Sequence, residues 1–321
     1  MLPVGFAYRS GVAFVNETLG RRALLLVIAA DLVGLLAGCA SFPRHLEYAT
    51  HVSGANHGAI LDYAVYTPPG FDPVRERLPL VSFLHGGGDS EDAFDRYGVS
   101  AALDRSIEAG EAPRTVILLP DGDFGMWADW SDGSRAYETW VVDELMPLVR
   151  AEKNTLDCPD HCHVMGVSMG AMGALRFAHH RPEAFSTLTV ISGAPPDTQR
   201  MVDFQNDWLI SFMIPTERIF GPIDPIDRVH REDLFLQWTS PEATGMERIV
   251  LAWGSRDRDA IRQGGAAFSE HLEAHGIEHE AWEYEGRHAW TDWTPVILRA
   301  LRHQLGDATA RSAGRAQSGG R

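Results

Sequence analysis

The stretch "HVMGVSMGAMGALRFAHH", residues 163–180, joins an apolar segment of strand length to a segment with helical spacing through Gly166-Val-Ser168-Met-Gly170. Glycine and serine are common turn residues, so a turn with no further role is one interpretation. The other is a nucleophile elbow, in which a tight strand-to-helix turn exposes the serine hydroxyl and small neighbours let the backbone pass close by. A Gly-x-Ser-x-Gly match alone does not decide between them.

Strand-length apolar segments recur along the chain and alternate with helix-like segments. Strands are expected at 61–67, 78–85, 115–120, 163–167, 186–192, 248–253 and 279–285. Helices are expected at 97–109, 136–152, 169–181, 263–275 and 294–304. Several strand segments are continuously apolar, as in parallel strands covered on both faces. The pattern predicts an α/β fold with one mostly parallel, doubly wound sheet, in a domain spanning residues 55–305.

Two segments depart from this alternation. Residues 195–246 mix large apolar side chains with prolines over a length too great for a plain loop, which predicts a cap-like or substrate-lining insertion. Residues 306–321 are small and polar, so we expect a disordered tail.

The first 38 residues have the layout of a lipoprotein-type signal peptide. Two arginines precede an apolar run at 23–36, and Leu36-Ala-Gly-Cys39 resembles a bacterial lipobox, in which the Cys39 thiol is acylated. Asp31 lies inside the run and disfavours insertion, and a short buried helix is the alternative. We expect an exported lipoprotein, with residues 39–54 as a tether to the outer membrane or cell surface.

Composition limits the possible partners. The chain has 321 residues, of which 45% are hydrophobic and 22% charged, as in a globular enzyme. The net charge of −16 argues against nucleic acid as a partner, because phosphate binding requires clustered Lys and Arg.

Two further cysteines, Cys158 and Cys162, lie in "DCPDHCH" (157–163). In an oxidising compartment they are expected to form a disulfide. A metal site with His161 or His163 is the alternative, but no second ligand pair accompanies them, so we expect no metal.

Two late strand ends offer the partners that a serine nucleophile needs. A serine hydroxyl reacts once a base takes its proton and a carboxylate orients that base. Asp257 follows a strand and a glycine in "RIVLAWGSRDRD" (248–259), and His288 does so in "AWEYEGRHAWTDW" (281–293). The order Ser168, Asp257, His288 predicts a catalytic triad, with Asp259 as a rival for the acid.

Backbone donors for an oxyanion are expected at two places. Met169 offers its N–H at the start of the helix, and "FLHGGGDS" (83–90) ends a strand with three glycines. Gly87 is the predicted second donor and Gly86 its rival. A phosphate-binding glycine loop would require Gly-Lys-Ser/Thr, or Gly-x-Gly-x-x-Gly followed by a helix, and this segment has neither.

An acidic residue and several tryptophans lie near the predicted site segments in the sequence. Asp121, Trp127 and Trp130 follow another strand and are expected to line the mouth of the same site. Trp290 and Trp293 are expected to pack the loop that carries His288.

Residues 55–303 resemble the esterase D-like family of α/β-hydrolases, which includes tributyrin, feruloyl, acetyl-xylan and enterochelin esterases and mycolyltransferases. The matching segments are "LHGGG", "LLPDGD…WADW", "YETWVVDELMPLV", "GVSMGAMGALRFAHHRPEAFSTLTVISGA", "GSRD" and "GRHAWTDW". The resemblance implies an α/β-hydrolase fold, with Ser168 as nucleophile, Asp257 as acid and His288 as base. It also implies an oxyanion hole formed by Gly87 and Met169. Ala171, where a glycine is usual, and the 195–246 insertion depart from the family pattern.

These observations together predict a serine esterase that hydrolyses a small-molecule or carbohydrate ester through an acyl-enzyme, without metal or organic cofactor. An acyltransferase of the mycolyltransferase type would use the same triad. A non-catalytic binding lipoprotein on a hydrolase fold is a further alternative, and it predicts a broken triad.

Overall fold

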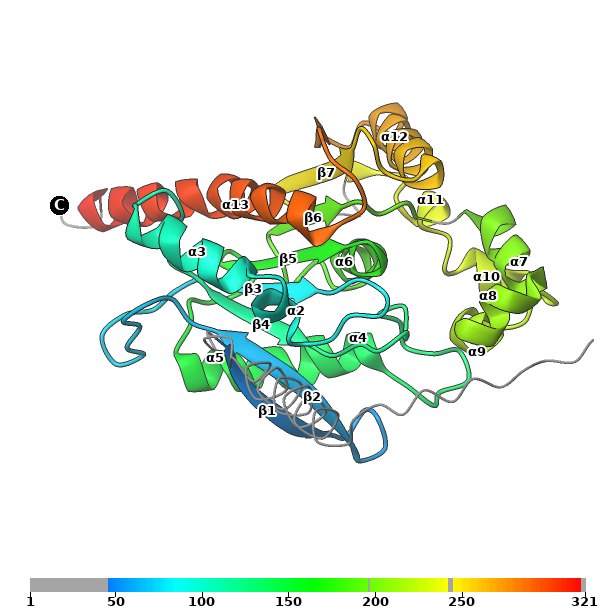
Figure 1. Cartoon of the computed structure of the whole chain (residues 1–321), viewed down its shortest axis with the longest axis horizontal. Coiled ribbons are helices and arrows are strands. Elements are labelled where there is room, and N and C mark those ends of the chain that lie inside the picture. The colour runs from blue at the N-terminus through cyan, green and yellow to red at the C-terminus, as the bar shows by residue number, and fades with distance from the viewer. Residues whose placement is uncertain (1–45, 196, 242–244, 319–321) are drawn as a thin grey trace, which may run out of the picture. The chain divides into compact units, whose positions relative to one another are not determined.

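The computed structural model describes residues 46–195, 197–241 and 245–318 (Figure 1). The expected signal peptide at 1–38 and the expected lipidation site Cys39 lie outside these residues. Within the described part of the chain, no helix combines the length and the apolar character needed to cross a membrane.

Within the described residues, eight strands form one sheet in the order β1-β2-β4-β3-β5-β6-β7-β8. Their bounds are β1 (Leu46–Ser53), β2 (Ala59–Tyr66), β3 (Leu80–Leu84), β4 (Val116–Pro120), β5 (Cys162–Val167), β6 (Thr187–Ile191), β7 (Arg248–Gly254) and β8 (Glu280–Tyr284). β2 pairs antiparallel with β1 and β4, and every other pair is parallel. The predicted mostly parallel α/β sheet is confirmed.

Helices cover both faces of the sheet. Their bounds are α2 (Ala93–Arg96), α3 (Val99–Glu108), α4 (Tyr137–Thr139), the π-helical η1 (Trp140–Leu145), α5 (Met146–Lys153), α6 (Met169–His180), α7 (Thr198–Asn206), α8 (Trp208–Met213), α9 (Thr216–Phe220), α10 (Asp227–His230), α11 (Leu234–Gln237), α12 (Asp259–Ala274) and α13 (Trp290–Ser318). Figure 1 shows α3 beside α13 on one face, where both share a core with α2. η1, α5, α6 and α12 pack on the other face.

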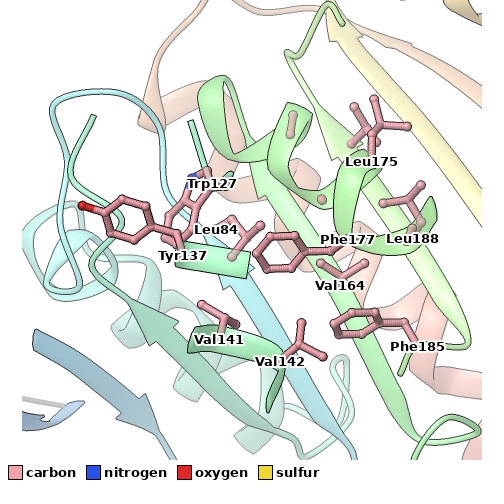
Figure 2. Packing of buried hydrophobic residues seen from close by; sticks show 14 of the residues in the cluster. Leu84, Trp127, Tyr137, Val141, Val142, Val164, Leu175, Phe177, Phe185 and Leu188 are labelled. Atoms are coloured by element: carbon pink, nitrogen blue, oxygen red, sulfur yellow. The ribbon is translucent and has the colours of Figure 1, made fainter. Parts of the chain in front are cut away.

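Alternate residues of the strands enter the two cores. In β3, Leu80 and Leu84 belong to the core under α6, whereas Val81 and Phe83 belong to the core under α3 and α13. Figure 2 shows the first of these cores, with Leu84 among side chains from η1, α6 and the neighbouring strands. Strands buried on both faces explain the continuous apolar segments in the sequence, and full burial of one such side chain is worth about 1.5–3 kcal/mol.

The insertion expected at 195–246 is helical and lies between β6 and β7. The Asp197 carboxylate accepts the Arg200 N–H at the start of α7, and Asp233 caps α11 in the same way. Asp233 also accepts from the backbone N–H and hydroxyl of Thr198, which ties the first helix of the insertion to the last.

Two predicted boundaries are wrong. Residues 46–53, expected in the tether, form β1 and pair with β2 over their whole length, so the domain begins before residue 55. Most side chains of β1 are exposed, which is why its sequence lacks an apolar pattern. The tail expected to be disordered from residue 306 instead continues α13 to Ser318, through a segment rich in the good helix formers Ala and Arg.

Candidate active site

Ser168 occupies a strained turn between β5 and α6, with φ 55° and ψ −117°. Its glycine neighbours are required by close backbone contacts. A Cβ atom added to Gly166 would lie 2.0 Å from the Gly170 carbonyl oxygen, and one added to Gly170 would lie 2.0 Å from the Leu84 carbonyl oxygen. The two glycines therefore let β3, β5 and α6 converge on the serine, as a nucleophile elbow requires.

The departure at Ala171 is accommodated by Gly193, the second residue after the end of β6. A Cβ atom added to Gly193 would lie 2.4 Å from the Ala171 Cβ. The Ala171 methyl group thus fills the space that a glycine at 171 would leave open on α6. The residue opposite it, Gly193, has no side chain and so leaves room for this methyl group.

Ser168, His288 and Asp257, which come from three separate turns, form a chain of side-chain contacts. The Ser168 Oγ lies 2.8 Å from His288 Nε2, and His288 Nδ1 lies 2.9 Å from Asp257 Oδ1. These contacts suit the neutral histidine tautomer, in which Nδ1–H donates to the carboxylate and Nε2 accepts the serine proton. The rival Asp259 instead pairs with Arg262 at the exposed start of α12.

The loops that carry Asp257 and His288 are held against each other. A Cβ atom added to Gly254 would lie 2.4 Å from the Gly286 carbonyl oxygen, and the Arg256 N–H donates to that oxygen. In the sequence, both glycines mark strand ends. Their structural role is to let these two loops approach closely enough for the acid and the histidine to meet.

The Asp257 carboxylate is buried but stays ionised. Burial raises the pKa of Asp257, but the hydrogen bond from His288 and the nearby Ser192 hydroxyl outweigh it and hold the pKa below its ordinary value. The Arg258 N–H also donates to Oδ1, at 2.7 Å. An ionised carboxylate at this position accepts the Nδ1–H of His288 and so orients the imidazole ring.

The glycine loop after β3 lies next to Ser168. A Cβ atom added to Gly86 would lie 3.3 Å from the Ser168 Cβ. One added to Gly87 would lie 3.3 Å from the Phe124 ring and 3.9 Å from the Met169 sulfur. The two segments predicted to supply oxyanion donors are therefore adjacent.

His85 fixes the orientation of this loop, a role that the sequence analysis missed. Its Nδ1–H donates to the Gly86 carbonyl oxygen at 2.8 Å, and its Nε2 accepts the Gly122 N–H at 3.0 Å. Because C=O and N–H point in opposite directions across a trans peptide, holding the Gly86 carbonyl also fixes the direction of the Gly87 N–H. The Trp127 Nε1–H donates to the His85 carbonyl and fixes the preceding peptide.

The expected lining role of Trp127 is wrong. Trp127 is fully buried, its ring packs edge-on against His85 at 4.9 Å, and a Cβ atom added to Gly173 would lie 2.4 Å from the Trp127 Cβ. Figure 2 shows it inside the core near Leu84. Trp127 therefore supports the glycine loop from within the core and does not line the mouth.

Asp121 and Trp130 contact other parts of the site region, and their lining role stays a prediction. An Asp121 carboxylate oxygen lies 3.4 Å from His85 Nε2. Arg218 of α9 stacks over the Trp130 ring at 5.0 Å and pairs with Asp132 at 2.7 Å. Trp130 thus belongs to the contact between the helical insertion and the loop after β4.

Trp290 and Trp293 pack the His288 loop as expected. Both are buried, and the Trp290 Nε1–H donates to Asp89 at 3.1 Å. The His288 ring stands edge-on to Trp293, with ring centres 4.8 Å apart. These contacts restrict the orientation of the imidazole.

The predicted disulfide lies at the opposite end of β5 from Ser168. Cys158 and Cys162 form a disulfide just before and at the start of β5. In the described part of the chain, no group of three or more His, Cys, Asp or Glu side chains is placed to hold a metal ion.

A strained serine after β5, an acid after β7 and a histidine after β8, on a mostly parallel sheet, define an α/β-hydrolase. Residues 59–304 match the family model described as "Putative esterase", and the chain belongs to this family.

A curated relative named as an esterase is consistent with membership of this family. The chain is 25% identical over 300 residues to Esterase Rv1288 of Mycobacterium tuberculosis, an alignment that covers 84% of this chain and 61% of that relative. The chain therefore spans less than two thirds of the relative's length.

Solved structures share its fold, and two of them illustrate the likeness. FphF, a fluorophosphonate-binding serine hydrolase of Staphylococcus aureus, superposes with a TM-score of 0.68 at 17% identity, covering 81% of this chain and 98% of that one. An S-formylglutathione hydrolase from Agrobacterium tumefaciens gives 0.65 at 17% identity, covering 83% and 96%. The predicted α/β-hydrolase fold is confirmed.

Proposed function

We propose that the chain is a serine carboxylic-ester hydrolase. The observation that carries the proposal is the unbroken line of contacts from the Ser168 hydroxyl through His288 to the buried Asp257 carboxylate. The adjacent glycine loop and the family membership support it.

Each group has a chemical task in this reaction. His288 Nε2 takes the Ser168 proton as the Oγ attacks the ester carbonyl carbon, and the Asp257 charge stabilises the resulting imidazolium. The N–H groups of Gly87 and Met169 donate to the oxyanion, where one such donor is worth about 2.7–4 kcal/mol. The imidazolium then protonates the departing alcohol and leaves an acyl group on Ser168. A water molecule deprotonated by His288 releases this acyl group as the acid.

The test is hydrolysis of p-nitrophenyl acetate, butyrate and octanoate by the full chain in detergent. Ser168→Ala should abolish turnover. Asp257→Asn should lower kcat by about 10⁴-fold, because the histidine loses its orienting partner. Asp259→Asn is the matched control, since Asp259 is exposed and pairs with Arg262 at the surface, and it should retain wild-type turnover. Full turnover by Ser168→Ala would falsify the proposal.

We also propose that the chain is exported and anchored to the membrane by a lipid on Cys39. The signal-like segment 1–38 and the Cys158–Cys162 disulfide, which suits an oxidising compartment, support this. Palmitate labelling in a bacterial host should be lost in Cys39→Ser, and equal labelling of both chains would contradict the anchor.

A further inference from the structure

Ser192 directly follows β6 and shares unusual features with Ser168. Its φ is 50°, in the left-handed region that non-glycine residues rarely adopt. The side chain is fully buried, and its backbone N–H donates to the Ala252 carbonyl of the neighbouring strand at 2.7 Å. Strain of this kind persists only where surrounding contacts enforce it, and it concentrates at functional sites.

The Ser192 hydroxyl has three neighbours. The Trp293 Nε1–H donates to it at 2.9 Å, and the Tyr284 hydroxyl lies 2.6 Å away. The third neighbour is Asp257, whose pKa the Ser192 hydroxyl helps to lower. Asp257 has an unused acceptor. Its Oδ1 accepts from the His288 Nδ1–H and the Arg258 N–H, whereas the buried Oδ2 makes no hydrogen bond to any residue that the structure describes.

Counting protons assigns a direction to these contacts. An indole N–H can only donate, and a carboxylate can only accept. Burial raises the pKa of Tyr284 to about 12, so its phenol keeps its proton and can donate to the Ser192 Oγ. The Ser192 proton is then free to point at Asp257. In this arrangement the protons of Trp293, Tyr284 and Ser192 each have an acceptor.

We propose that Ser192 is a positioning residue whose hydroxyl donates to Oδ2 of Asp257, with Tyr284 and Trp293 orienting that hydroxyl. Through this bond Ser192 fixes the plane of the carboxylate, and hence the direction in which Oδ1 meets His288. The inference rests on the proposed function, because the orientation of Asp257 matters for turnover only if His288 is the base.

Two variants separate this role from a purely structural one. Ser192→Ala removes the hydroxyl and keeps the backbone strain, whereas Ser192→Gly removes the hydroxyl and relieves the strain. Both should lower kcat by about 10- to 100-fold, the usual worth of a hydrogen bond to a charged group, with KM little changed. Ser82→Ala, at a buried β3 serine whose hydroxyl has no hydrogen-bond partner, is the matched control and should keep wild-type kcat.

A double-mutant cycle tests whether Ser192 acts through Asp257. In the Asp257→Asn background, Ser192→Gly should lower kcat by no more than about twofold, because residues that act as a unit are strongly non-additive. The rate at which a fluorophosphonate probe labels Ser168 gives a second readout of the same base without requiring the natural ester. Urea unfolding of each variant confirms that the compared chains are folded.

The outcomes are distinguishable. A wild-type kcat in Ser192→Gly, or an equal loss in both backgrounds, overturns the inference while leaving the esterase intact. Turnover or labelling that does not depend on Ser168 overturns the proposed function and the inference with it.

Discussion

Gly193→Ala should destabilise the chain because a methyl group of α6 already occupies the space that the new side chain needs. The added Cβ would lie 2.4 Å from the Ala171 Cβ and 3.4 Å from a Val190 methyl carbon. Carbon atoms in contact normally stay about 3.5–4.0 Å apart, so the loop or the helix must shift by about 1 Å. Overpacking of this kind typically costs about 1–3 kcal/mol.

The partner substitution tests the cause directly. Ala171→Gly alone should cost about 1 kcal/mol for a glycine inside a helix, and up to about 1 kcal/mol more for the lost buried methyl group. When both changes are combined, the methyl group moves from one side of the contact to the other. The double variant should therefore be more stable than the sum of the single costs implies, by about 1–3 kcal/mol.

The measurement is the free energy of unfolding in urea for the wild type, both single variants and the double variant. Costs that add to within about 0.5 kcal/mol would show that the two methyl groups do not compete, and would refute the packing explanation. The kcat values carry a second expectation. Because Ser168 and Ser192 flank this contact, Gly193→Ala should also lower kcat, and Ala171→Gly should restore it.

Two histidines carry further predictions. His85→Leu should lower kcat for p-nitrophenyl acetate by about 10- to 100-fold with little change in KM. The reason is that the Gly87 N–H is still present but loses its fixed orientation. An unchanged kcat would contradict the proposed role of this loop. Burial lowers the pKa of His163 from 6.5 to about 3. As the pH falls, His163 is therefore protonated in the unfolded chain before it is protonated in the folded chain. The free energy of unfolding decreases from about pH 6.5 downward for this reason. Between pH 7 and pH 5 the loss should be about 2 kcal/mol, and His163→Asn should remove it; equal pH slopes in urea unfolding would refute this.

The site could be predicted because its three main side chains follow parallel strands directly or within a few residues. Parallel strands place their carboxyl ends along one edge of the sheet, so residues that follow such strands converge wherever the strands can be identified. Ser168, Asp257 and His288 follow β5, β7 and β8, all of which are continuously apolar or flanked by glycine. Chain order and strand ends therefore sufficed, without knowledge of any side-chain contact.

The direction of a loop could not be predicted in the same way. Trp127 and Trp130 belong to one short segment, yet the first lies in the core and the second meets the helical insertion. Asp123, Met126 and Trp127 all have positive φ, and these backbone turns send the Trp127 ring inward. A positive φ at a non-glycine residue cannot be recognised from the sequence. The sequence therefore offers no reason to expect different positions for Trp127 and Trp130.

His85 and Ser192 were missed although the sequence carries a signal for both. β3, β5 and β6 are neighbours in the sheet, and each is followed immediately by one polar residue: His85, Ser168 and Ser192. The register pairs Leu84 with Gly166 and Val167 with Ile191, so the three polar residues follow one another along the carboxyl edge. Only the middle one stands in the Gly-x-Ser-x-Gly motif that marks a nucleophile. The other two act on groups that become visible in three dimensions, a carbonyl oxygen of Gly86 and a carboxylate oxygen of Asp257. A polar residue directly after each of several adjacent buried strands is therefore a reason to assign all of them to the site before any motif is considered.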